Sequence, residues 1–172
     1  MKCLMMGLGL NALLMIAIQQ QVIAAPSGAL INALQQTLPE GFLDNREMLD
    51  RTEYFVMEVD LNGDGVKEAI GVVTSPRCGV QECLAYVYEK VDDAYRVVGR
   101  FAVQSDNAAI GVLKSKSGGW RDLAAQIYNR SARTVWKKSV FDGSNYVPTY
   151  KDVGQPAQVI LKIKRGKGTK FK

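Results

Sequence analysis

The spacing of apolar side chains changes from helical to alternating along the chain. From Ser27 to about Leu38, leucine and isoleucine recur three and four positions apart, which predicts one short helix that is capped by Ser27 and stopped by Pro39 and Gly41. Beyond Asp50 the apolar residues alternate with polar ones or form short runs, which is typical of β-strands. We expect eight strands, over residues 54–59, 69–74, 84–88, 96–103, 110–113, 123–128, 134–141 and 158–163.

Turn residues separate these strands and indicate the fold class. Asn-Gly, Asp-Gly and Gly-Gly pairs lie between the expected strands, at a spacing of roughly 8–12 residues that favours antiparallel all-β folds. The segments 88–97 and 139–147 share a pattern, an apolar residue, an acidic turn and then tyrosine, which is a weak internal repeat. The sequence therefore predicts an all-β, mainly antiparallel fold of meandering sheets, propeller-blade-like or a sandwich, with one short N-terminal helix.

The first 24 residues have the pattern of a secretory signal peptide. A basic start, Met1-Lys2, precedes an apolar run that extends to Ile18, and small residues up to Ala24 and Ala25 follow. A membrane anchor is the alternative, but an interrupted run of about 16 residues is short for a span of roughly 20. We predict cleavage near Ala24, export to the periplasm without membrane insertion, and a single β-rich domain over residues 25–172.

Two cysteines would be left after this cleavage. Removal of the signal peptide takes away Cys3 and leaves Cys78 and Cys83. An even pair in an exported protein predicts a disulfide, here one that closes a short loop and fixes a hairpin tip. If the chain is not exported, the two residues would be free thiols.

The segment from Asp60 to Glu68 has the spacing of a calcium-binding loop. Asp60, Asn62 and Asp64 stand at positions 1, 3 and 5, and Glu68 stands at position 9. Position 12, which carries a bidentate glutamate in EF-hands, is Gly71, and strands flank the loop instead of helices. These four residues are candidate Ca²⁺ ligands; the alternative is a tight hairpin whose side chains bind their own backbone amides. No other cofactor is predicted.

The ionisable residues limit the kinds of catalytic site that the chain can form. The chain has 22 Lys and Arg, 17 Asp and Glu, and no histidine. The lack of histidine excludes Ser-His-Asp and Cys-His nucleophile pairs, histidine-ligated zinc and imidazole acid–base catalysis, so we predict a binding protein and not an enzyme. A hydrolase that uses two carboxylates, Asp60 with Glu68 or Asp92 with Asp93, is a weaker alternative because Asp92 and Asp93 belong to a turn.

The six basic residues between Lys162 and Lys172 predict a solvated, frayed tail and no nucleic-acid partner.

One connection between strands is longer than a hairpin needs. Gln104, Ser105, Asp106 and Asn107, with two alanines, form a six-residue link of small or polar residues. Surplus loop length on a rigid sheet often serves recognition, so these residues are candidates for partner binding; an ordinary solvated connection is the alternative.

Taken together, the chain resembles the periplasmic immunity proteins of bacterial type VI secretion. The resemblance rests on the Asp60–Glu68 hairpin, the Cys78–Cys83 loop and the strand–loop–strand from Arg96 to Leu113. More narrowly, the chain resembles the immunity protein of a secreted peptidoglycan amidase of the papain-like class.

This resemblance implies a non-enzymatic inhibitor. Such a protein binds the amidase injected by a sister cell and blocks its Cys-His cleft, with Ser105, Asp106 and Asn107 as the candidate plug. A calcium-stiffened binding module for cell-wall or surface glycans is the alternative function.

Overall fold

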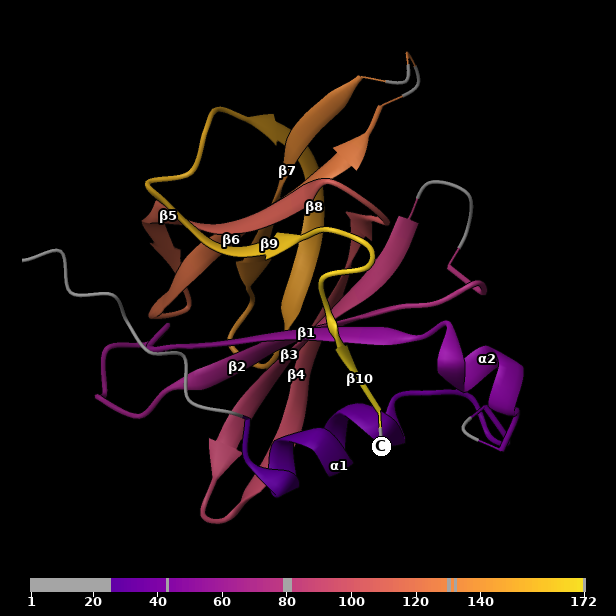
Figure 1. Cartoon of the computed structure of the whole chain (residues 1–172). Coiled ribbons are helices and arrows are strands. Elements are labelled where there is room, and N and C mark those ends of the chain that lie inside the picture. The colour runs from indigo at the N-terminus through magenta and orange to yellow at the C-terminus, as the bar shows by residue number, and fades with distance from the viewer. Residues whose placement is uncertain (1–25, 43, 79–81, 130, 132, 172) are drawn as a thin grey trace, which may run out of the picture.

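The computed structural model describes residues 26–42, 44–78, 82–129, 131 and 133–171, and strands dominate it (Figure 1). Over these residues two short helices, α1 (Gly28–Gln36) and α2 (Arg46–Asp50), precede the strands. The strands are β1 (Glu53–Val59), β2 (Glu68–Thr74), β3 (Glu82–Val91), β4 (Ala94–Gln104), β5 (Ala108–Ser117), β6 (Trp120–Tyr128), β7 (Thr134–Phe141), β8 (Tyr146–Val153), β9 (Gln158–Ile163) and β10 (Thr169–Lys170). The predicted all-β, mainly antiparallel fold with a short N-terminal helix is confirmed. Helix α2 and the strands β8 and β10 were not predicted.

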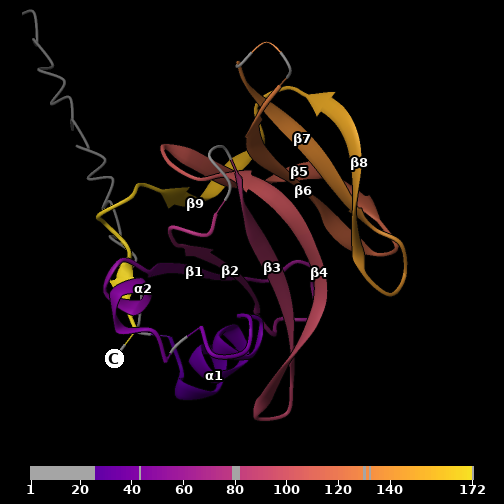
Figure 2. The ribbon, with the colours of Figure 1, turned by 90° about the vertical axis from the view of Figure 1, so that its right-hand side faces the viewer.

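All ten strands belong to one curled sheet, in the order β10-β1-β2-β3-β4-β8-β7-β6-β5-β9. Strands β1–β4 form one antiparallel meander and β5–β8 form a second one. The meanders join where β4 and β8 run parallel, at Gly99 and Tyr146. A Cβ atom on Gly99 would lie 2.4 Å from the Cβ of Tyr146, so this contact requires glycine. The sequence left open blade-like sheets or a sandwich; the structure joins both meanders in one sheet (Figures 1 and 2).

The main core lies where the two meanders face each other. Residues from both contribute to one apolar cluster, which includes Ile70, Val87 and Phe101 from the first meander and Ile110 and Leu123 from the second. Strand β2 is buried along its whole length because α1 covers its other face through Leu30 and Leu34.

The N-cap of α1 is confirmed. The backbone N–H of Leu30 donates to the Ser27 hydroxyl at 3.3 Å, and the helix ends at Gln36 with Thr37 as its C-cap, before Pro39. A Cβ atom on Gly71 would approach Leu34 Cδ1 to 2.8 Å, so the glycine of β2 allows α1 to pack closely on the sheet.

The end of the basic C-terminal segment is docked and not frayed, so that expectation is wrong. Strand β10 pairs with β1 through Thr169 and Lys170, and Phe171 is buried with its ring centroid 4.9 Å from that of Tyr54. Apolar burial of Phe171 fixes the chain end against the sheet.

The predicted signal peptide, residues 1–24, lies outside the described residues. Among the helices of the described part of the chain, none is long and apolar enough to span a membrane.

Candidate functional site

The predicted recognition loop connects the two meanders. Strand β4 continues to Gln104 and β5 begins at Ala108, so only three residues, Ser105–Asn107, lie outside the strands. Because β4 and β5 are not neighbours in the sheet, this segment is a corner that passes from one meander to the other and is not a hairpin tip. The expected surplus of loop length is therefore not present.

The four candidate residues differ in exposure. Gln104 and Ser105 are buried, at 4% and 7% of full exposure, Asp106 is half-buried, and Asn107 is exposed. Asn107 also has a positive φ of 50°, a conformation that asparagine tolerates better than most residues. In this structure, then, the corner presents Asn107 and part of Asp106 to a partner, whereas Gln104 and Ser105 belong to the interior.

Hydrogen bonds fix this corner from several sides. The Gln104 amide donates from Nε2 to the Asp106 carbonyl at 2.8 Å and accepts from the Thr134 hydroxyl at 3.0 Å. The Asp106 Oδ1 atom accepts from the backbone N–H groups of Asn107 at 2.8 Å and Arg165 at 2.9 Å. The corner is thus tied to the start of β7 and to the turn after β9, and Asp106 positions the backbone that carries Asn107.

A disulfide lies at the same end of the sheet. Cys78 and Cys83 are joined, with their Cα atoms 4.8 Å apart, as their predicted pairing requires. Cys83 pairs with Val103 across β3 and β4, next to the Glu82–Gln104 pair. The disulfide therefore fixes the strand that lies alongside the corner.

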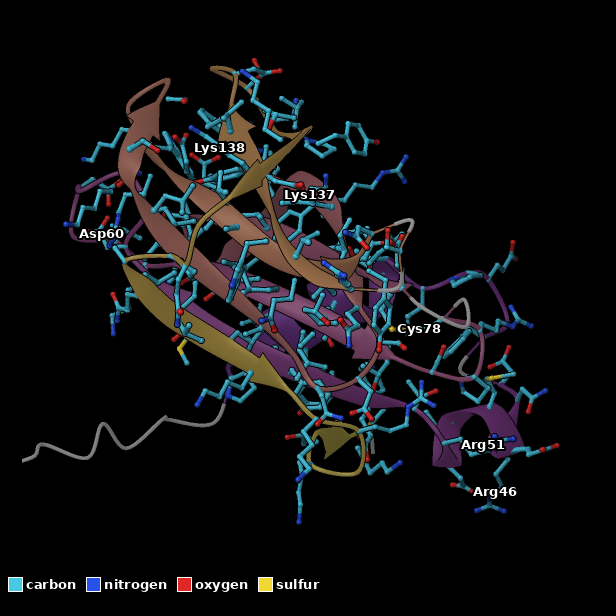
Figure 3. The ribbon with its side chains drawn as sticks, turned by 90° about the horizontal axis from the view of Figure 1, so that it is seen from above. Arg46, Arg51, Asp60, Cys78, Lys137 and Lys138 are labelled. Carbon is cyan, nitrogen blue, oxygen red and sulfur yellow. A yellow bond between two sulfur atoms is a disulfide. The ribbon has the colours of Figure 1, made fainter. Side chains whose placement is uncertain are left out.

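The predicted calcium loop lies at the opposite end of the sheet, and in Figure 3 Asp60 is far from Cys78. The loop connects β1 to β2, and its Leu61 is fully buried in the main core. The backbone N–H of Arg121 donates to the Leu61 carbonyl at 2.8 Å. This contact attaches the loop to β6 of the second meander.

The four candidate calcium ligands share this loop, and their oxygens accept backbone amides. The Asp60 carboxylate accepts from the N–H groups of Gly63 at 2.6 Å and Gly65 at 3.1 Å. Asn62 and Asp64 each accept from the residue two positions later. These are the contacts of the self-bonded hairpin that was the alternative interpretation.

Glu68, the fourth candidate ligand, is 1% exposed and accepts from the Leu61 N–H at 2.7 Å. Burial raises the pKa of its carboxyl group, and the neighbouring carboxylates of Asp64 and Asp60 raise it further. Among the described residues, no group of three or more His, Cys, Asp or Glu side chains is arranged to hold a metal ion. The oxygens of the loop stabilise the hairpin itself.

The alternative carboxylate pair, Asp92 and Asp93, occupies the turn between β3 and β4. Both residues are exposed, and Asp92 has a φ of 53°. The predicted turn is therefore present, and both side chains lie on the surface.

A buried ion pair on β6 and β7 was not anticipated from the sequence. The Asp122 side chain is fully buried, and the Lys138 ammonium group lies 2.7 Å from its Oδ2 atom and 3.3 Å from the Ser115 hydroxyl. Burial alone would raise the pKa of Asp122, but hydrogen bonds from Lys138, Ser115 and Ser117 outweigh it and the pKa lies below the usual range. The Lys138 ammonium group is thus engaged both by this carboxylate and by the Ser115 hydroxyl.

The charges are unevenly divided along the chain, before and after the corner, a signal that the sequence contains but that the strand pattern does not reveal. Residues 25–104 contain seven Lys and Arg against 13 Asp and Glu, whereas residues 105–172 contain 14 against four. The corner at Asp106 and Asn107 therefore stands, along the sequence, at the border between an acidic and a basic half of the chain.

No family model, no curated protein and no solved structure matches the chain.

Proposed function

We propose that this chain is a non-enzymatic immunity protein of the type VI secretion class, exported to the periplasm, where it binds a secreted papain-like peptidoglycan amidase and blocks its active site. The observation that carries the proposal is the corner at Asp106 and Asn107. Its backbone is fixed by hydrogen bonds to β7 and to the turn after β9, while Asn107 remains exposed.

A corner of this kind suits inhibition because little ordering is needed on binding. A loop that is already fixed loses little conformational entropy when it enters a cleft, so more of the contact energy contributes to affinity. The Asn107 amide can donate to and accept from the groups of a Cys-His site. Asp106 stabilises the backbone of this corner, because its Oδ1 atom already accepts hydrogen bonds from two backbone N–H groups.

The positive charge of residues 105–172 supports recognition of an acidic surface around such a cleft. Residues 105–172 carry an excess of Lys and Arg, and we expect the positive field of this part of the chain to extend to the corner. A field of this kind accelerates association with an acidic partner and weakens as salt is added. We therefore expect the association rate to fall as ionic strength rises, with less change in the dissociation rate.

The test is inhibition of a purified papain-like wall amidase from the same bacterium, with its turnover measured on wall peptidoglycan. The native chain should inhibit at a one-to-one ratio. The Asn107→Gly variant keeps the positive φ and removes the amide, and it should weaken inhibition by at least about tenfold with an unchanged melting temperature.

Asn145→Gly is the matched control, since Asn145 is an exposed turn asparagine at the other end of β7, and it should inhibit like the native chain. Failure of the native chain to inhibit any such amidase would refute the proposed function. Inhibition that is equal for the native chain and Asn107→Gly would refute the role of the corner.

A further inference from the structure

A groove runs along the unpaired edge of β1, on a part of the molecule that the proposed function does not use. The groove has a volume of about 860 Å³ and is lined by α1, β1, β9 and the segment around β10. None of the corner residues Gln104–Asn107 lines it, so a role for the groove is independent of the inhibitor proposal.

The strand pairing leaves this edge open. Strand β10 covers only Glu53 and Tyr54, so within the described residues no strand pairs with β1 from Phe55 to Val59 on that side. Strand β9 pairs with β5 on one side, and its other edge is likewise without a neighbour in the described sheet. In Figures 1 and 2, β9, the last strand at one end of the curled sheet, lies near β1, the second strand from the other end.

The lining shows that the groove follows the strand edges. Tyr54, Phe55, Val56 and Met57 are consecutive residues of β1, and all four contribute to the wall. Since successive side chains of a strand point to opposite faces, only the edge of the strand can present four in a row. The groove therefore gives access to backbone N–H and C=O groups of β1, the groups that an added strand would pair with.

The side chains of the groove combine an apolar surface with positive charge. Its apolar part consists of the half-buried Ile31, Val56 and Met57, whereas Ile160 and Leu161 are only 7% and 6% exposed and add little to it. The charged residues among its lining are Lys162, Lys167 and Lys170, and no acidic residue is among them. Lys170 is engaged with Glu53 at 3.5 Å, whereas Lys162 and Lys167 form no ion pair within the described part of the chain.

We infer that this groove binds an extended peptide segment of a partner protein, which adds as a strand to the open edge of β1 between Phe55 and Val59. Backbone pairing with β1 supplies affinity. The alternating side chains of the added strand place apolar groups on Met57 and acidic groups near Lys162 and Lys167. The partner segment is therefore one in which apolar and acidic residues alternate.

The probe is a synthetic, end-capped octapeptide of alternating valine and glutamate, with binding to the full chain measured by fluorescence anisotropy. We expect saturable binding, and at least about tenfold weaker binding of the valine–lysine peptide. A valine–glutamate peptide with alternate backbone nitrogens methylated should lose binding to a similar extent, because it keeps the charges but lacks the N–H donors.

Two double variants separate the groove from general electrostatics. Lys162→Glu with Lys167→Glu should reduce affinity by at least about tenfold, whereas Lys114→Glu with Lys151→Glu, the same charge change on exposed lysines of β5 and β8, should leave it nearly unchanged. Circular dichroism verifies that both variants fold. Hydrogen exchange should show new protection of the β1 amides between Phe55 and Val59 when the peptide is bound.

Any of four outcomes would overturn the inference. Equal loss of affinity in both double variants would mean that net charge alone attracts the peptide. Full binding of the methylated peptide, or no added protection in β1, would exclude strand addition. A stable dimer in sedimentation, with β1 already protected before peptide is added, would show that a second copy of the chain occupies this edge.

Discussion

Replacing Lys138 with methionine should destabilise the fold strongly, because it leaves the Asp122 carboxylate buried without its counter-charge. The side chain of Asp122 has no exposed surface, and the Lys138 ammonium group lies 2.7 Å from its Oδ2 atom. Removal of one partner of a buried ion pair costs roughly 3–5 kcal/mol, chiefly through the uncompensated charge. For a domain of about 150 residues this corresponds to a fall in the melting temperature of roughly 10 °C.

The pH dependence identifies the cause of this destabilisation. The lowered pKa of Asp122 means that its ionised form stabilises the native state above the ordinary aspartate pKa, and that this stabilisation is lost as pH falls through the lowered value. In Lys138→Met the burial remains without the lysine, so the pKa of Asp122 should rise and the carboxyl group should be protonated more easily. The stability difference between the two proteins should therefore be largest near pH 7 and should narrow as the pH falls toward about 4.

Urea unfolding of both proteins across this pH range measures the effect, with Lys137→Met as the control. Lys137 is the adjacent residue of β7, and its partner Asp152 is 65% exposed, so its removal should cost at most about 1 kcal/mol. Adding Asp122→Asn to Lys138→Met should recover part of the loss, since the buried group is then neutral. A cost below about 1 kcal/mol for Lys138→Met, or a cost that does not change with pH, would refute the reasoning.

Three further predictions concern the disulfide, a closely packed glycine and the Asp60 hairpin. Replacing both Cys78 and Cys83 with serine should lower the free energy of unfolding by about 2 kcal/mol, because the disulfide closes a short loop; an unchanged urea midpoint would contradict this. Gly111→Ala should destabilise by about 1–3 kcal/mol, since its Cβ would lie 2.4 Å from Pro156 Cγ, whereas Gly154→Ala has no atom within 4 Å and should unfold at nearly the native urea concentration. Asp60→Ala should lower the melting temperature equally in EDTA and in millimolar calcium, because Asp60 bonds the backbone of Gly63 and Gly65; a loss confined to the calcium sample would establish the loop as a Ca²⁺ site.

Local sequence pattern was sufficient for most of the fold. The first helix followed from the leucine spacing after Ser27, and the expected strands correspond to β1–β7 and β9. Strand β8 was not predicted because Pro148 and a run of exposed polar residues interrupt the alternation of apolar and polar positions. In the structure that strand meets β4 only at Tyr146, and Pro148 pairs with Ser139 of β7 beside a shift in register, so the proline is tolerated next to a bulge.

The candidate corner illustrates what the pattern could not supply. Gln104 and Ser105 look like loop residues because they are polar, yet Gln104 pairs with Glu82 in the sheet and reaches Thr134, 30 positions along the chain. Contacts of that separation depend on how the two meanders pack, which hydrophobic spacing does not encode. The polar character of Gln104 and Ser105 predicted exposed side chains, whereas both are buried in the structure.

The position of the corner is fixed by contacts with both meanders and not by the loop residues alone. A segment that passes between two meanders is held at both ends by different parts of the sheet, and here Thr134 and Arg165 add contacts from the second meander. Movement of Asn107 relative to the sheet would therefore break hydrogen bonds in two strand-bearing regions at once, whereas a hairpin tip can bend without disturbing its neighbours. A partner that contacts Asn107 would therefore meet a backbone that is held from two sides, which is the property that recognition by shape requires.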